Sequence, residues 1–205
     1  MRLVGMLDSP FVRRTAISME ALGVPFRHEP VSVFSTIEKF RAINPVIKAP
    51  TLVCDDGEVL MESSLILQFV ESTHAGSLWP ADAMERQHDF RAVSLALAAC
   101  DKSVQIVYER NLRPKEVQYE PWMDRVTGQL FAAYAGLEKE VARRTEAFSA
   151  TRAHASITAA VAWQFTQSML AKLVPASKHP ALAAHSARME ATPEFLKYPP
   201  DGPGV

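Results

Sequence analysis

The chain has 205 residues, and its 22 Lys and Arg residues nearly balance its 23 Asp and Glu residues, giving a formal net charge of −1. This length suits one large domain or two modest ones. The near-neutral charge argues against a broad basic surface for nucleic acid or for an anionic membrane. The apolar fraction of 48% excludes intrinsic disorder of the whole chain.

The cysteine content and the first residues lead us to expect a cytoplasmic protein without a membrane span. Cys54 and Cys100 lie far apart and form neither a disulfide framework nor a Cys-x-x-Cys pair, which suits a reducing compartment. The apolar run at residues 3–7 is too short for a secretory signal. The most apolar later stretch, residues 157–174, contains two glutamines and a lysine and therefore indicates a buried helix.

The first half, up to about residue 75, alternates between strand-like and helix-like segments. Gly23 and Pro25 end the first predicted helix, because glycine accepts the left-handed C-cap conformation and proline cannot continue a helix. The pair Asp56-Gly57 predicts a hairpin turn, because glycine accepts a positive φ at little cost. The predicted elements are a strand at 3–7, a helix at 10–22, a strand at 26–33, a helix at 36–43, hairpin strands at 51–54 and 59–61, and a helix at 63–73.

From Trp79 onward the strand signals are absent, and apolar residues recur at helical spacing. The predicted helices cover residues 88–110, 120–143, 156–174, 180–190 and 193–198. A break near residues 76–84 separates the two patterns. We therefore expect an α/β domain at residues 1–77 and an all-helical domain at residues 84–198.

Two serines precede predicted helices in the first half. Ser9 stands before Pro10, which is preorganised for the first helical position, so its hydroxyl caps the helix or steadies an anion at the positive helix end. Ser63 follows Glu62 and allows the same two interpretations. A hydroxyl beside backbone N–H groups suits a carboxylate and a glutamate suits an ammonium, so this pair fits the α-amino acid end of a ligand.

A third candidate segment, Lys48-Ala49-Pro50-Thr51, leads into the third predicted strand. Proline at the start of a strand removes no ladder hydrogen bond, so it is compatible with this position. The sequence leaves the isomer of the Ala49–Pro50 peptide bond open.

The order of these segments resembles that of the glutathione S-transferase superfamily over essentially the whole chain. Ser-Pro-Phe with a following arginine is most similar to serine-type members, such as the plant tau class and its bacterial relatives. Omega-class members carry a nucleophilic cysteine at the place of Ser9. The matching motifs are Ser9-Pro10-Phe11-Val12-Arg13-Arg14, Asn44-Pro45, Lys48-Ala49-Pro50-Thr51-Leu52 and Glu62-Ser63-Ser64.

The resemblance implies a thioredoxin-like N-terminal domain that binds glutathione, followed by an all-helical C-terminal domain. Ser9 would donate a hydrogen bond to the glutathione sulfur and favour its thiolate, which would attack a small hydrophobic electrophile. The backbone of Ala49 would pair with the cysteinyl part, and Glu62 and Ser63 would hold the γ-glutamyl end. The implied glutathione-binding residues are Ser9, Phe11, Lys48, Ala49, Pro50, Glu62 and Ser63, and the implied electrophile pocket between the domains contains Phe11, Tyr108 and Trp163.

The sequence also departs from the family pattern. Ala49 stands where members usually have valine, although backbone pairing needs no side chain. Ser156 is expected to cap a helix of the second half, but Ala159 stands where many members have aspartate, which weakens the local capping box. The lysine that many tau-class members carry in their second helix has no counterpart at residues 35–38.

Other interpretations stay open. The chain could be a non-catalytic binding protein on the same scaffold, or a glutathione-dependent peroxidase or isomerase. Phe11, Tyr108 and Trp163 also suit ordinary core packing, and Arg13 and Arg14 suit a solvated helix face. The six histidines lack metal-ligand spacing and are expected at the surface or in helix caps, so we expect no metal. A homodimer is expected from the resemblance.

Overall fold

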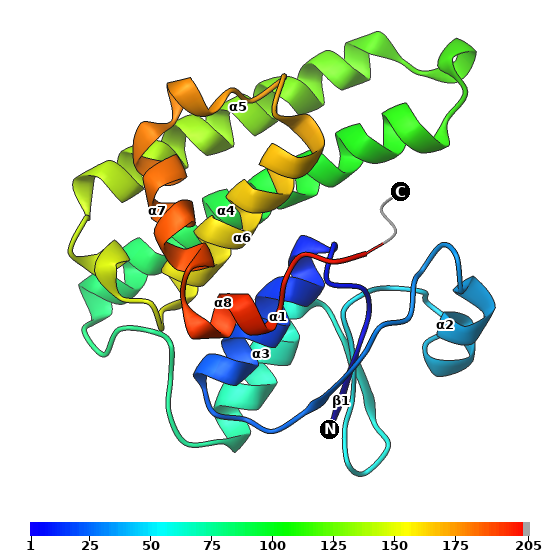
Figure 1. Cartoon of the computed structure of the whole chain (residues 1–205), viewed down its shortest axis with the longest axis vertical. Helices are drawn as coiled ribbons and strands as arrows, with labels where there is room; N and C mark the ends of the chain where they lie inside the picture. The colour runs from blue at the N-terminus through cyan, green and yellow to red at the C-terminus, as the bar shows by residue number, and fades with distance from the viewer. Residues whose placement is uncertain (203–205) are drawn as a thin grey trace. The chain divides into compact units, whose positions relative to one another are not determined.

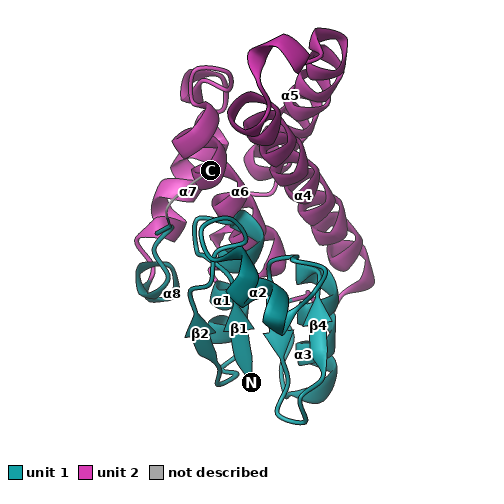
Figure 2. Cartoon of the chain, turned by 90° about the vertical axis from the view of Figure 1, so that its right-hand side faces the viewer, with its two compact units in different colours: residues 1–78, 193–204 teal, residues 79–192, 205 magenta. Residues whose placement is uncertain are grey.

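The computed structural model describes residues 1–202 and divides into two compact units (Figures 1 and 2). Among the described residues, unit 1 consists of residues 1–78 and 193–202, and unit 2 consists of residues 79–192. Unit 1 contains a mixed sheet with helices, and unit 2 is helical. The predicted fold class, a thioredoxin-like α/β part followed by an all-helical part, is confirmed.

Unit 1 contains the predicted strands and helices in the predicted order. Its elements are β1 (Arg2–Val4), α1 (Pro10–Ala21), β2 (Arg27–Glu29), α2 (Ile37–Ile43), β3 (Thr51–Val53), β4 (Val59–Met61), α3 (Ser63–Thr73) and α8 (Pro193–Lys197). The strand order is β2-β1-β3-β4. β1 pairs parallel with β2, which requires the crossover that α1 supplies, and the other two pairs are antiparallel.

Helices cover both faces of the sheet of unit 1. Successive strand residues point to opposite faces, so Leu3 and its cross-strand partner Leu52 share one face, and both are fully buried. Figure 2 shows α1 and α3 together on one side of the sheet and α2 on the other. The α2 side contains a small apolar cluster in which Val4 and Val53 meet Phe40.

Two glycines end elements where the sequence predicts. Gly23 has a φ of 70°, and the N–H groups of Gly23 and Val24 donate to carbonyls of the last turn of α1 at 2.9 and 3.0 Å. This is the expected left-handed C-cap. Gly57 has a φ of 91° in the turn between β3 and β4. Both predicted chain reversals are confirmed.

The short helix α8 packs on α1 within unit 1, whereas the sequence analysis grouped residues 193–198 with the helical half. Arg13, expected on a solvated face, is only 1% exposed. Its Nε donates to the Tyr198 carbonyl at 2.8 Å, and its guanidinium lies 5.2 Å from the centre of the Phe195 ring. At the other end of α1, Glu20 accepts from the Tyr198 hydroxyl at 3.0 Å. The prediction for Arg13 is wrong because the returning segment supplies partners for a buried charge.

Unit 2 is built from long helices that pack on one another. Its elements are α4 (Ala83–Leu112), α5 (Glu120–Arg143), α6 (His154–Leu170) and α7 (Pro180–Glu190), with 3-10 turns at Lys115–Val117, Ala147–Ser149 and Ala176–Lys178. Helices α4 and α5 lie side by side, and α6 packs against α4 and α7 (Figure 1). Every residue from His154 to Trp163 is buried, which confirms the prediction of a central helix.

An ion pair with two differently exposed acids joins α4 to the end of α5. The Arg144 guanidinium donates to Asp89 at 2.9 Å and to Glu85 at 2.8 Å. The side chains of Arg144 and Asp89 are 8% and 4% exposed, whereas that of Glu85 is 53% exposed. Burial lowers the pKa of Arg144, but the hydrogen bonds and charges of the two acids outweigh burial and raise that pKa.

Helix α6 begins without a side-chain cap. Its N-cap residue is Ala153, whose backbone is extended with φ −142° and ψ 140°. Ser156 lies inside the first turn, and its hydroxyl donates to the Phe148 carbonyl at 3.5 Å. The predicted cap at Ser156 is wrong because the helix starts earlier, at His154.

Three histidines of unit 2 are buried. His179 is the N-cap residue of α7, one of the two places that the sequence predicted, but the prediction of surface or capping histidines is wrong for His154 and His185. The Nε2 of His185 lies 3.0 Å from the Ser156 carbonyl, and its Nδ1 lies 3.0 Å from the Arg188 guanidinium. Because a guanidinium can only donate, Nδ1 accepts and the ring is neutral. Burial, aided by the charge of Arg188 and opposed by the Ser156 hydrogen bond, lowers the pKa of His185 from 6.5 to about 4.

The lowered pKa of His185 predicts that the protein loses stability in acid. Above pH 6.5 the ring of His185 is neutral in the folded and the unfolded chain. Between pH 6.5 and about 4 the unfolded chain takes up the proton and the folded chain does not, so the free energy of unfolding falls by about 3 kcal/mol as the pH drops. Urea unfolding across this range measures the loss. The variant His185→Gln should depend less on pH, and a slope equal to that of the wild type would contradict the assignment.

Neither a membrane-spanning helix nor a metal-binding cluster is found in the part of the chain that the structure describes. No helix within residues 1–202 combines the length and apolar character needed to cross a bilayer. Over the same residues, no group of three His, Cys, Asp or Glu side chains could hold a metal ion.

Candidate functional site

A glycine brings two of the predicted site segments together at the start of α1. Gly5 has a φ of 141°. A Cβ at this position would lie 2.6 Å from a methyl carbon of Val12 and 3.3 Å from the Cβ of Ala49. The absence of a side chain at Gly5 therefore lets the loop before β3 approach the first turn of α1.

Ser9 is the N-cap residue of α1 and is half-buried. Its Oγ accepts from the Val12 N–H at 3.5 Å, the outer limit of a hydrogen bond. No residue among those described accepts the proton of the Ser9 hydroxyl. The side chain therefore combines a weak cap with a donor at the positive end of a helix, and both sequence interpretations of Ser9 are compatible with this geometry.

The loop before β3 is held by a buried asparagine. Asn44 is 4% exposed and donates from Nδ2 to the Thr51 hydroxyl at 2.8 Å, which donates to the Lys48 carbonyl at 2.8 Å. The Ala49–Pro50 peptide bond between these anchors is cis, which decides the isomer that the sequence left open. Pro50 is buried, Ala49 is half-buried and the Lys48 side chain is exposed.

Glu62 caps α3, so the interpretation of Ser63 as the cap is wrong. The Glu62 carboxylate accepts from the N–H groups of Ser64 at 3.1 Å and Leu65 at 3.2 Å, while Ser63 is already the first helical residue. The φ of Glu62 is 73°, a conformation that costs a non-glycine residue roughly 1–3 kcal/mol. Such strain persists where the surrounding structure holds a residue in place, and it is frequent at binding sites.

A second arginine of α1 lies behind this cap. Arg14 is 2% exposed, and its Nη1 donates to the hydroxyls of Ser63 at 3.0 Å and Ser64 at 3.2 Å. The Ser63 hydroxyl, itself 1% exposed, lies 3.4 Å from a carboxylate oxygen of Glu62. The prediction of a solvated Arg14 is wrong because the first turn of α3 accepts its hydrogen bonds.

The predicted aromatic residues of unit 2 have different environments. Tyr108 of α4 is 39% exposed. Trp163 of α6 is 4% exposed, and its ring centre lies 5.4 Å from those of both Tyr134 and His179. Core packing is therefore observed for Trp163, one of the two roles that the sequence allowed.

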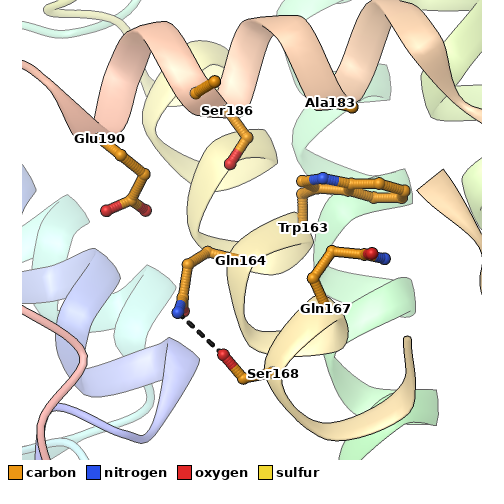
Figure 3. Close-up of a pocket in the computed structure, with 8 residues that line it drawn as sticks. Trp163, Gln164, Gln167, Ser168, Ala183, Ser186 and Glu190 are labelled. Atoms are coloured by element: carbon orange, nitrogen blue, oxygen red, sulfur yellow. Dashed lines mark hydrogen bonds between the residues drawn. The ribbon is translucent and has the colours of Figure 1, made fainter. Parts of the chain in front are cut away.

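Trp163 also borders a pocket of about 370 Å³ between α6 and α7 (Figure 3). Two of the polar groups there bond within unit 2: Gln164 donates to the Ser168 hydroxyl at 3.0 Å, and Gln167 donates to the Val174 carbonyl at 2.9 Å. Tyr108 is not among the lining residues. The side chains of α6 in this pocket are Trp163, Gln164, Gln167 and Ser168, and those of α7 include Ser186 and Glu190.

Two buried polar residues of this region, Asn44 and Arg14, were not predicted from the sequence as parts of the site. Asn44 was recognised only as part of a motif, although asparagine at a helix end before Pro45 is a typical turn former that bonds to nearby backbone. Indeed, the Val46 N–H donates to the Asn44 side chain at 3.0 Å. For Arg14 the sequence offers no local signal, because arginine is rarely buried without partners and those partners come from α3.

Comparison with known proteins identifies the family. Residues 3–78 match the family model described as glutathione S-transferase, N-terminal domain. The crystal structure of a glutathione transferase family member from Pseudomonas fluorescens Pf-5, with bound glutathione, is 28% identical with a TM-score of 0.84, and the match covers 98% of this chain and 99% of that one. Residues 3–78 therefore belong to the glutathione S-transferase N-terminal domain family. The resemblance of the sequence motifs to the glutathione S-transferase superfamily is thereby confirmed.

Two curated relatives match a part of the chain. The uncharacterized GST-like protein YibF of Escherichia coli K12 is 30% identical over 121 residues, covering 58% of this chain and 59% of that protein. The probable maleylacetoacetate isomerase of Caenorhabditis elegans is 36% identical over 89 residues, covering 42% and 41%. The chain thus spans less than two thirds of the length of either relative.

Proposed function

We propose that this superfamily member is a glutathione transferase that joins glutathione to small hydrophobic electrophiles. The observation that carries the proposal is the Ser9 hydroxyl at the N-terminus of α1. It accepts one long hydrogen bond from Val12, and its proton has no acceptor among the described residues. The glutathione bound to the Pseudomonas relative supports glutathione as the ligand.

In the proposed reaction Ser9 stabilises the glutathione sulfur as a thiolate. A free thiol has a pKa of about 8.5. A hydrogen bond from Ser9 to the charged form, together with the positive end of α1, lowers the pKa of the bound thiol. The thiol proton passes to water. The thiolate forms a carbon–sulfur bond with the electrophile, and the leaving group departs with its bonding electrons. The protein supplies an activated nucleophile and proximity.

We assign the rest of glutathione to the loops beside Ser9. The Glu62 carboxylate pairs with the γ-glutamyl ammonium, and Ser63 donates to the adjacent α-carboxylate. The backbone of Ala49, before the cis Pro50, pairs with the cysteinyl part. The exposed Lys48 side chain binds the glycine carboxylate.

The electrophile would contact aromatic side chains. We assign Phe11, Tyr108 and Trp163 to this role. Of the two in unit 2, Tyr108 is more exposed than Trp163. No metal is required by this chemistry. We expect the protein to act in the cytoplasm as a homodimer.

Glutathione binding tests the proposal directly. Glutathione in large excess is expected to raise the Tm, because a ligand at 100 times its Kd adds about 2.7 kcal/mol to the stability of the folded state. Retention on a glutathione resin is a second measurement. A chain that shows neither effect is not a glutathione transferase, and the non-catalytic binding protein then becomes the better interpretation.

A glutathione-dependent isomerase is the second candidate, because the Caenorhabditis elegans relative is a probable maleylacetoacetate isomerase. The same thiolate would add to a conjugated double bond, allow rotation about it and leave again. Conjugation consumes one glutathione per turnover, isomerisation consumes none, and peroxide reduction yields oxidised glutathione. Measuring glutathione consumption and its product separates the three reactions.

A further inference from the structure

The pocket between α6 and α7 contains a buried hydrogen-bond donor without an acceptor. Trp163 is 4% exposed, and no described residue accepts from its indole N–H. An indole N–H that is buried usually has a partner. The nitrogen is not closed off from solvent, and Figure 3 shows it at the end of the ring toward Ser186 and Gln164. This N–H is therefore available to a ligand in the pocket.

Two glutamines of α6 present acceptors to the same pocket. The Nε2 of Gln164 donates to the Ser168 hydroxyl at 3.0 Å, and the Nε2 of Gln167 donates to the Val174 carbonyl at 2.9 Å. These bonds hold both side-chain amides by their nitrogen ends. No described residue donates to the Oε1 atom of either glutamine. Helix α6 thus offers a ligand one N–H donor and two carbonyl acceptors.

The α7 wall of the pocket is small and is held in place. Ala183 and Ala187 line it with methyl groups, which leave room for a flat apolar group. Between them, the Ser186 hydroxyl donates to the Ala160 carbonyl of α6 at 3.3 Å. This bond ties the two helices together, so the pocket of about 370 Å³ is formed before a ligand binds.

The charge and the hydrogen-bonding groups of the lining decide which ligands fit. Among the described lining residues Glu190 alone carries a charge, so an anion would meet a carboxylate without a counter-charge. An ammonium or a guanidinium can only donate, so neither accepts from Trp163. An alcohol accepts but has one proton for two glutamine carbonyls. A primary carboxamide has one carbonyl and two N–H protons, which match the donor and both acceptors.

We propose that this pocket binds an aromatic primary carboxamide. The carboxamide oxygen accepts from the indole N–H of Trp163, the two N–H protons meet the Oε1 atoms of Gln164 and Gln167, and the ring packs on Ala183 and Ala187. All of the lining residues belong to unit 2, and Trp163 is the only one that we also assign to the electrophile. The inference therefore does not rest on the proposed transferase reaction.

NMR of nitrogen-labelled protein, titrated with benzamide in the absence of glutathione, tests the proposal. The chain has three tryptophans and hence three indole N–H signals. The variants Trp79→Phe, Trp122→Phe and Trp163→Phe assign them, and any two suffice if the third does not fold. Benzamide is expected to shift the Trp163 signal with a Kd of about 1 mM. An unmoved Trp163 signal at millimolar benzamide overturns the inference.

Two analogues of the same shape separate the contacts of the carboxamide. Acetophenone keeps the carbonyl but lacks both N–H protons, so it is expected to bind about tenfold more weakly than benzamide. Benzoate also lacks these protons and adds a negative charge near Glu190, so it should bind more weakly still. If either analogue binds as tightly as benzamide, the assigned pairing with the glutamines is wrong.

Two neighbouring alanines of α7 provide matched variants. Ala183→Leu places a larger side chain inside the pocket and is expected to weaken benzamide binding at least about tenfold. Ala184→Leu makes the same change at an exposed position outside the lining and should keep the Kd within about twofold. Ala187→Leu replaces the first variant if circular dichroism shows that Ala183→Leu is unfolded. Equal Kd values for the pocket variant and for Ala184→Leu would place benzamide elsewhere and overturn the inference.

Discussion

Alanine in place of Ser9 is expected to lower kcat/KM with glutathione and a chloronitrobenzene substrate about 100-fold. A hydrogen bond to a charged group contributes about 1.5–3 kcal/mol, which corresponds to a rate factor of about 10 to 150. The thiol of bound glutathione should also ionise at a pH about one to two units higher. Rates measured across pH, and thiolate absorbance in the ultraviolet, report the two effects separately.

The variant Ser9→Thr is the matched control, because it keeps a hydroxyl at the N-cap of α1. It should retain most of the activity and a pH profile close to that of the wild type. The long cap contact of 3.5 Å means that Ser9→Ala should unfold at nearly the wild-type temperature. An unchanged pH profile in Ser9→Ala would rule out the role assigned to this hydroxyl.

Removing the charge of Asp89 is expected to lower the free energy of unfolding by about 3–5 kcal/mol, the cost of leaving a buried charge without its buried partner. Asp89→Asn keeps the side-chain volume and one oxygen but withdraws the counter-charge from Arg144. Urea unfolding monitored by circular dichroism measures the loss.

Glu85→Gln provides the comparison, because Glu85 contacts the same guanidinium at 2.8 Å from an exposed position. An exposed ion pair contributes about 1 kcal/mol or less, so this variant should lose far less stability than Asp89→Asn. Equal losses in the two variants would show that burial does not set the strength of these contacts.

Local signals in the sequence predicted most of the fold. Helix α1 begins at Pro10 and closes at Gly23, because both residues act through their own backbone conformation. The bounds predicted for α3, α5 and α7 match those observed, since their apolar spacing is regular. Helix α4 begins earlier than predicted because Asp82 caps a polar first turn, in which apolar periodicity gives no signal.

The sequence predicted which segments form the candidate site, but it did not predict the contacts between their side chains. The motifs around Ser9, Pro50 and Glu62 could be found because each joins a strand to a helix or enters a strand. Which residue caps α3 depends on the backbone angle of Glu62, and this angle is fixed by packing rather than by residue type. The burial of Arg14 depends on hydroxyls far along the chain, so no local pattern contains it.

The return of α8 to unit 1 has a consequence for synthesis of the protein. The Tyr198 carbonyl that meets Arg13, and the Tyr198 hydroxyl that meets Glu20, leave the ribosome only after the whole of unit 2 has been made. Helices α4 to α7 can therefore complete their core while α1 still lacks these contacts. Unit 1 precedes unit 2 along most of the chain but thus finishes folding after it.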